Sequence, residues 1–179
     1  MNKRQIKNFQ YKYLPEFVYG GIDGAVTTFA IVAGVLGASL SSVIVLILGF
    51  ANLFADGFSM AVSDYLSVKS RIDLKKRIKF ANVNPMKSAL VTFASFFVIG
   101  IIPLISFILP LVTDFSISIK NQFIYSAILT VVAFGIVGWM KGKISGKSKI
   151  MSSIQTISIG SVAAIIAFGV GYLLRGIIV

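Results

Sequence analysis

Residues that can bind a cation recur at every fourth position in one apolar stretch of the chain: Asn52, Asp56, Met60 and Asp64. Positions four apart lie on one face of a helix, with a slow drift around it. One helical stripe therefore carries an amide, two carboxylates and a thioether. A further carboxylate, Asp23, lies in the preceding apolar stretch. These residue types at this spacing predict a site or a path for a metal ion.

Ligand chemistry narrows the choice of ion. Oxygen ligands alone suit Mg²⁺ or Ca²⁺, but the thioether of Met60 favours softer ions such as Fe²⁺, with Mn²⁺ as the alternative. The chain has no cysteine and no histidine, so thiolate or imidazole sites for zinc or copper are less expected. It also lacks a nucleophile paired with a base and a cofactor motif, so we do not expect an enzyme.

Composition places these residues in a lipid bilayer. The 179 residues are 56% hydrophobic and only 13% charged, with a mean hydropathy of +0.91, whereas soluble domains contain about 25% charged residues. At about 20 residues per span, the length allows five or six crossings. The net charge of +11 lies in short clusters between apolar runs, so we do not expect binding to nucleic acid.

We predict an all-α, polytopic membrane protein with a basic cytosolic tail at residues 1–15 and a single membrane domain at residues 16–179. A basic connector, residues 69–87, separates the second predicted helix from the third. The five predicted transmembrane helices cover residues 16–38, 43–68, 88–111, 121–140 and 151–174.

The distribution of basic residues predicts the orientation. All lysines and arginines except Lys120 and Arg175 fall in the amino-terminal tail and in the connectors after the second and fourth helices. Short loops rich in lysine and arginine stay in the cytosol. The amino terminus is therefore predicted to be cytosolic and the carboxyl terminus to lie outside the cell or in a lumen.

Ionisable side chains inside a span are costly, by about 2.5 to 3.5 kcal/mol on insertion scales, and so are candidates for function. Counting from the predicted helix ends, Asp23 and Met60 each lie about 12 Å from the cytosolic side, at one level. Asp56 would lie one turn deeper, and Asp64 near the cytosolic mouth. Glu16 is set aside here, because a carboxylate in the first turn of a helix is explained by the helix dipole.

One chain offers few ligands for an ion that needs about six. The last three predicted helices contain no acidic residue, so a homodimer that doubles the ligand set is expected. Small residues are expected to let the first two helices approach closely. These residues are Gly20, Gly24, Gly34, Gly37, Gly49 and Gly57.

Several motifs resemble the vacuolar iron transporter family, and the resemblance extends over about residues 16–175. The most specific are YGGIDGAVTTFA from Tyr19, ANLFADGFSMA from Ala51 and YLSVKS from Tyr65. The resemblance implies a dimeric five-helix exporter of Fe²⁺ that exchanges the ion for protons, with its path at the dimer interface, lined by the first two helices. By motif position, the family's pathway aspartate falls on Asp23 and its methionine on Met60.

Two departures from the family pattern leave alternatives open. Asn52 stands where some members have an acidic residue, and Asp56 could supply that carboxylate. The basic connector stands where typical iron-transporting members have a cytosolic helical domain rich in glutamate and methionine. The metal ion would be the substrate, and no resident cofactor is expected. A passive divalent-cation channel, or a metal-binding membrane component without transport, is the alternative. The membrane could be the cell membrane or an internal, vacuole-type membrane.

Overall fold

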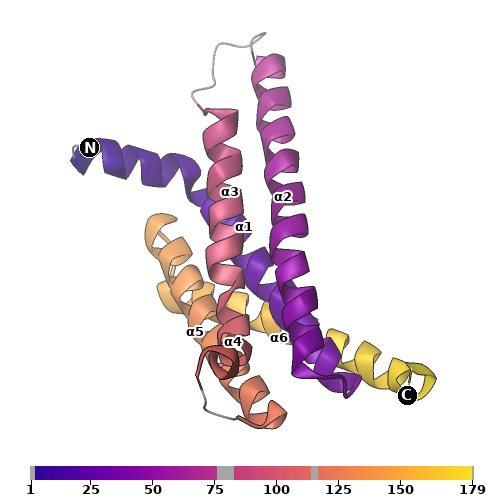
Figure 1. Cartoon of the computed structure of the whole chain (residues 1–179). Coiled ribbons are helices and arrows are strands. Elements are labelled where there is room, and N and C mark those ends of the chain that lie inside the picture. Colours follow the sequence, from indigo (N-terminus) through magenta and orange to yellow (C-terminus); the bar gives the residue numbers. More distant parts are fainter. Residues whose placement is uncertain (1–2, 76–82, 114–116, 179) are drawn as a thin grey trace.

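The structure is a computed structural model that describes residues 3–75, 83–113 and 117–178. All regular structure in these residues is helical, and five stretches are long and apolar enough to cross a membrane. This confirms the predicted all-α, multi-pass membrane fold (Figure 1). The elements are α1 (Lys3–Gly37), α2 (Ser42–Lys75), α3 (Pro85–Gly100), η1 (Ile102–Leu104), α4 (Ile105–Val112), α5 (Ile119–Ile144) and α6 (Lys149–Ile178).

The helices at both sides of the first turn are longer than the sequence predicted. Helix α1 begins at Lys3 rather than at Glu16, and α2 continues to Lys75. Pro15 lies inside α1, and Figure 1 shows the amino-terminal segment projecting sideways from the other helices before the chain turns to follow α3. A proline removes one backbone hydrogen bond and clashes with the preceding turn, which bends a helix. Part of the predicted connector, residues 76–82, lies outside the described residues.

The third span is broken where one continuous helix was predicted. Helix α3 ends at Gly100, the single turn η1 contains Pro103, and α4 completes the span. Proline has no N–H, so the regular ladder is interrupted there and a tighter turn takes its place. The Ser126 hydroxyl of α5 donates a hydrogen bond of 2.6 Å to the Pro103 carbonyl. A neighbouring helix thus satisfies a carbonyl at the break, as lipid cannot.

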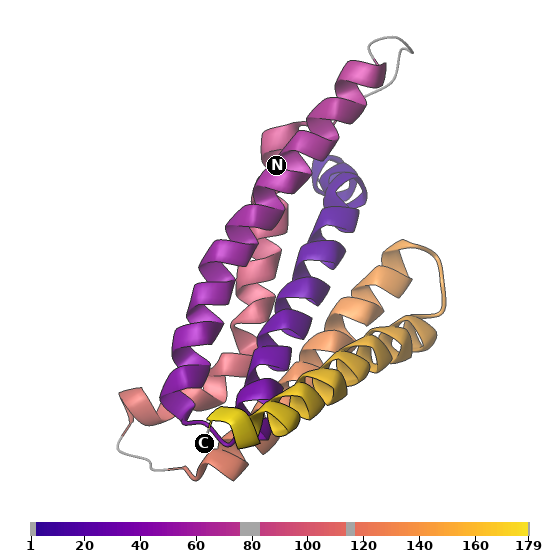
Figure 2. The ribbon, with the colours of Figure 1, turned by 90° about the vertical axis from the view of Figure 1, so that its right-hand side faces the viewer.

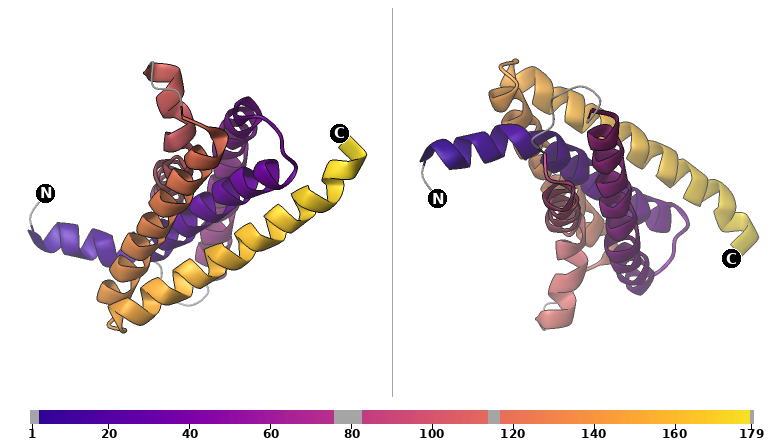
Figure 3. Two further views of the ribbon diagram at one scale, coloured as in Figure 1. Left: turned by 90° about the horizontal axis from the view of Figure 1, so that it is seen from below. Right: turned by 90° about the horizontal axis from the view of Figure 1, so that it is seen from above.

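Helix α1 is the centre of the fold, because it contacts α2, α3, α5 and α6. In its apolar window 56% of the residues are buried, compared with 6% in α6. Figure 2 shows α1, α2 and α3 running side by side, and α5 and α6 leaning away from them at one end. Figure 3 shows α6 crossing the other helices obliquely along one side. The predicted site helices, α1 and α2, therefore belong to the three-helix half of the molecule.

Glycines let α1 approach α3 closely. A Cβ atom added at Gly20 would meet the Thr92 carbonyl and the Ser95 hydroxyl of α3, and one added at Gly24 would meet the Phe96 carbonyl. The prediction that these glycines bring α1 against α2 is wrong: they face α3. On the other side of α1, Gly37 meets α6.

We predict that Gly24→Ala destabilises the protein by about 1 to 3 kcal/mol, the usual range for overpacking, because the added methyl group meets backbone atoms of α3. Gly135→Ala is the matched control, since nothing lies within 4 Å of a Cβ atom built there. Thermal unfolding of the two purified variants in detergent checks this. Equal melting temperatures would contradict the close α1–α3 crossing.

Candidate functional site

Hydrogen bonds fix the register between α1 and α2. The Asn52 side-chain nitrogen of α2 donates to the Thr27 hydroxyl of α1 at 3.1 Å. The same hydroxyl donates to the Asp23 backbone carbonyl at 2.8 Å. The two helices are antiparallel across the short turn after Gly37, so residues nearer the turn than Thr27 face residues nearer the turn than Asn52.

One turn farther from the connecting turn, two carboxylates face each other. The register places Asp56 of α2 opposite Asp23 of α1, and the charge of Asp56 acts on Asp23. The depth estimate from the sequence had paired Asp23 with Met60, one turn away. The short turn at residues 38–41 sets the register, and the estimate had counted from helix ends that lie farther out in the structure. Both carboxylates are half-buried.

Asp23 also borders an open pocket of about 520 Å³ on the other side of α1. Lys141 and Ser145, at the end of α5, line the same pocket. The Asp23 side chain is thus accessible both from the side of α2 and from the pocket beside α5. It does not lie in a closed core.

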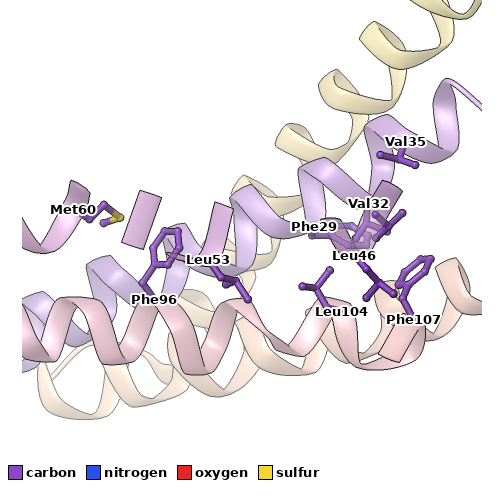
Figure 4. Close-up of a cluster of buried hydrophobic side chains, with 10 residues drawn as sticks. Phe29, Val32, Val35, Leu46, Leu53, Met60, Phe96, Leu104 and Phe107 are labelled. Carbon is purple, nitrogen blue, oxygen red and sulfur yellow. The ribbon is translucent and has the colours of Figure 1, made fainter. Parts of the chain in front are cut away.

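A second cavity, of about 470 Å³, opens one turn beyond the Asp23 level. Met60 lines it and is itself buried, and Figure 4 shows this side chain at one end of the apolar core cluster. The thioether therefore separates the packed core from the cavity. The full lining is Pro15, Glu16, Tyr19, Ser59, Met60, Ser63, Asp64, Ser67 and Arg71.

Two carboxylates line this cavity, one from each helix. The Ser88 hydroxyl donates to Glu16 Oε1 at 3.0 Å, and the Thr92 hydroxyl donates to Asp64 Oδ2 at 3.2 Å. The other carboxylate oxygen of Glu16 is buried without a hydrogen-bond partner in the structure. Such an atom is costly unless a donor or a cation binds it.

Sequence reasoning missed Glu16. The helix-dipole explanation fails because α1 begins at Lys3, so Glu16 is well inside the helix. A usable signal was present: Glu16 lies seven residues before Asp23, which is close to two helical turns and puts both carboxylates on one face.

No group of three or more aspartate, glutamate, cysteine or histidine side chains is placed to hold a metal ion among the described residues. The predicted residues, together with Glu16 and Thr27, are instead arranged in layers: Glu16 with Asp64, then Met60, then Asp23 with Asp56, then Asn52 with Thr27. Each layer is an incomplete coordination shell for one divalent ion.

The surface of α2 beside these layers is small and polar. Ser59, Ser63 and Ser67 are exposed on the single chain, and all three line the cavity. Other exposed side chains of α2, such as Phe54 and Phe58, are large and apolar. A hydroxyl-rich strip is better suited to water or to another protein surface than to lipid.

Comparison with known proteins places this arrangement in a family. The family model described as the VIT family matches residues 14–79 and 75–172. The chain belongs to the VIT family. A vacuolar iron transporter of Toxoplasma gondii is 27% identical, over 97% of this chain and 78% of that protein. Vacuolar iron transporter homolog 1 of Arabidopsis thaliana is 32% identical, over 94% of this chain and 88% of that protein. These relatives are named as transporters, in agreement with the expectation that the chain is not an enzyme.

Alignment lengths divide these VIT relatives into two kinds. The Toxoplasma alignment runs over 237 residues, more than the 179 of this chain, so that protein has residues without a counterpart here. The Arabidopsis alignment runs over only 185 residues, which is close to the 179 residues of this chain. The family match consists of two segments that overlap at residues 75–79. Helix α2 ends at Lys75, and the overlap lies within the basic connector of the sequence.

We predict that a cysteine at Ser63 reacts with a charged, membrane-impermeant thiol reagent more than about tenfold faster than one at Ser95, because reactivity follows exposure. Ser63 is exposed and lines the cavity, whereas Ser95 is 4% exposed at the α1–α3 contact. The chain has no cysteine of its own, so each variant carries a single label. Reagent added to sealed vesicles from either side gives the rates; labelling of Ser63→Cys from the cytosolic side alone is expected.

Proposed function

We propose that the chain moves Fe²⁺, with Mn²⁺ as the alternative, out of the cytosol along α1 and α2. The observation that carries this proposal is the layered facing of acidic residues across these helices. Glu16 and Asp64 share one cavity, and Asp23 and Asp56 face each other deeper in the pair. The vacuolar iron transporters among the relatives support a metal ion as the substrate.

The path runs from the cavity toward the α1–α2 turn. A cation enters at Glu16 and Asp64, passes the thioether of Met60 and reaches the Asp23 layer. The side-chain oxygen of Asn52 offers the next ligand, because its nitrogen is already bonded to Thr27. Adjacent binding layers of moderate strength suit passage better than one tight site, since an ion must also leave.

The mixed ligand set supports a transition-metal ion. Carboxylate oxygens alone favour Mg²⁺ or Ca²⁺, and the buried thioether of Met60 favours a softer ion. Met60 is the only ligand of this kind in the layers described above, so it is the residue that distinguishes Fe²⁺ from Ca²⁺.

A homodimer completes the coordination shells. Each layer offers at most two carboxylates within a single chain, too few for a divalent ion. A two-fold axis beside α1 and α2 doubles every layer. It would also place the strip of Ser59, Ser63 and Ser67, which is exposed on one copy, along the water-accessible path between the two copies. We therefore propose that the path lies at an interface between two copies.

Proton antiport is the proposed source of energy. The register places Asp23 and Asp56 opposite each other, and two facing carboxylates repel when both are ionised. A divalent cation relieves this repulsion, and so does a proton. A site that alternates between the two couples the outward flux of metal to the inward flux of protons.

Capture of the ion falls to the cavity in this chain. The connector after α2 is basic, and positive charge lowers the local concentration of divalent cations. Glu16 and Asp64 are the carboxylates nearest the mouth of the path. They take the place of the separate metal-gathering domain that the resemblance to the family leads one to expect.

We predict that Asp23→Asn lowers Fe²⁺ flux by about tenfold or more, since the loss of even a supporting partner of a metal ligand costs 10- to 100-fold. The protein is reconstituted in liposomes with a metal-sensitive dye inside, with and without a pH gradient. Asp73→Asn is the matched control, because Asp73 is exposed and outside the lining of both pockets.

Met60→Leu in the same assay is expected to lower the flux of Fe²⁺ relative to that of Ca²⁺. If flux does not depend on the pH gradient, the result contradicts antiport and indicates a passive channel. If folded, dimeric protein gives no flux of any ion, the result contradicts transport and indicates a metal-binding membrane component.

We predict that Glu16→Gln weakens Mn²⁺ binding to the purified protein by about tenfold, the lower limit for losing a group that supports a metal site. Glutamine keeps an oxygen that can accept from Ser88 but loses the charge. Asp73→Asn is the control: it removes an exposed carboxylate that lines neither pocket. Equilibrium dialysis measures the affinity, and an unchanged dissociation constant for Glu16→Gln would remove Glu16 from the site.

A further inference from the structure

An apolar groove runs between α2 and α3, with a volume of about 440 Å³. Its sides are exposed on the single chain at Phe58, Val62, Met86 and Leu90. The complete lining is Phe58, Ala61, Val62, Tyr65, Met86, Ala89, Leu90 and Phe93. Every lining side chain except that of Tyr65 is entirely apolar, so the groove suits hydrocarbon rather than water or an ion.

The groove is separate from the proposed metal path. On α2 the lining residues Phe58, Val62 and Tyr65 are spaced along one face. Asp56 and Met60 lie two residues from Phe58 in either direction, about 200° around the helix at 100° per residue. The metal ligands and the groove therefore occupy opposite faces of α2, and a partner copy seated on the metal face leaves the groove open to lipid.

Aromatic rings lie at one end of the groove. The Phe93 ring, which lines the groove, stacks on Phe97 at 6.1 Å between centroids, and Phe54 packs on Phe97 at 5.1 Å. An acyl chain that lies along the groove thus meets aromatic carbon at this end.

Lys69 places a positive charge at the end of the groove near Tyr65. Lys69 lies one turn beyond Tyr65 on the same face of α2, and its ammonium group is 5.9 Å from the Tyr65 ring centroid. The first turn of α3 also lies at the groove, since α3 starts at Pro85 and Met86 lines the groove. A helix amino terminus adds partial positive charge. The exposed Lys87 lies in the same turn.

We propose that this groove binds an anionic phospholipid, with an acyl chain against Val62, Leu90 and Phe93 and the phosphate at Lys69. The charge complementarity decides the occupant: an apolar channel ending at a lysine matches a molecule with a hydrocarbon tail and an anionic head. A bound lipid joins α2 to α3 on the face that the metal path does not use. This proposal does not depend on the proposed transport.

Native mass spectrometry of the purified full-length protein, stripped of lipid in detergent, tests the proposal. Phosphatidylglycerol and phosphatidylcholine with identical acyl chains are added separately. Lys69→Gln is expected to weaken phosphatidylglycerol binding about fivefold, the usual contribution of one lysine near an anionic surface, and to leave phosphatidylcholine unchanged. Val62→Trp fills the groove and is expected to weaken the binding of both lipids.

Two control variants keep the test specific. Lys143→Gln removes a lysine near Trp139, away from the groove, and Ile47→Trp adds an indole at an exposed position near the other end of α2. Neither is expected to change lipid binding. An equal loss in Lys143→Gln would overturn the site in favour of general charge attraction. Unchanged binding in Lys69→Gln and Val62→Trp would also overturn it. Loss of the dimer in Val62→Trp would make the groove an interface between copies and end the lipid proposal.

Discussion

The cost of a carboxylate inside a bilayer governs the arrangement of the first three helices. An ionisable group in hydrocarbon must find a polar partner within the protein. Helix α3, which has no acidic residue, supplies hydroxyl donors: Ser88 bonds to Glu16 and Thr92 bonds to Asp64. The acidic residues of α1 and α2 are thus supported by a third helix that takes no direct part in the proposed path.

That support depends on how closely the backbones approach. Gly20 of α1 lies against the Thr92 carbonyl and the Ser95 hydroxyl, so any side chain there would push α3 away. Short hydroxyl side chains such as that of Ser88 reach a carboxylate only across a short interhelical distance. The glycines of α1 therefore serve the site indirectly: they bring α3 close enough for serine and threonine to bond to the acidic residues.

The sequence was sufficient for the number of spans and for the stripe on α2, because both follow from apolar length and helical period. It was not sufficient for contacts between helices. The glycines were predicted to face α2 but face α3, since spacing shows that a helix has a small face and not which neighbour it meets. Glu16 was set aside as a first-turn residue explained by the helix dipole, whereas α1 begins at Lys3. The turn at residues 38–41 decides which residue of α2 faces Asp23. The depth estimate did not include this turn, because it counted from the other ends of the two helices.

The proposed dimer links ion selectivity to energy coupling. One chain offers at most two carboxylates in a layer, and the proposed two-fold axis would bring four carboxylates to the level of Asp23 and Asp56. Four like charges at one level would repel strongly, and bound cations would relieve that repulsion. When a metal ion leaves toward the outside, protons are the cations that can take its place. In the proposed antiporter, the feature that would give the layer its affinity for a divalent ion would therefore also make it exchange that ion for protons.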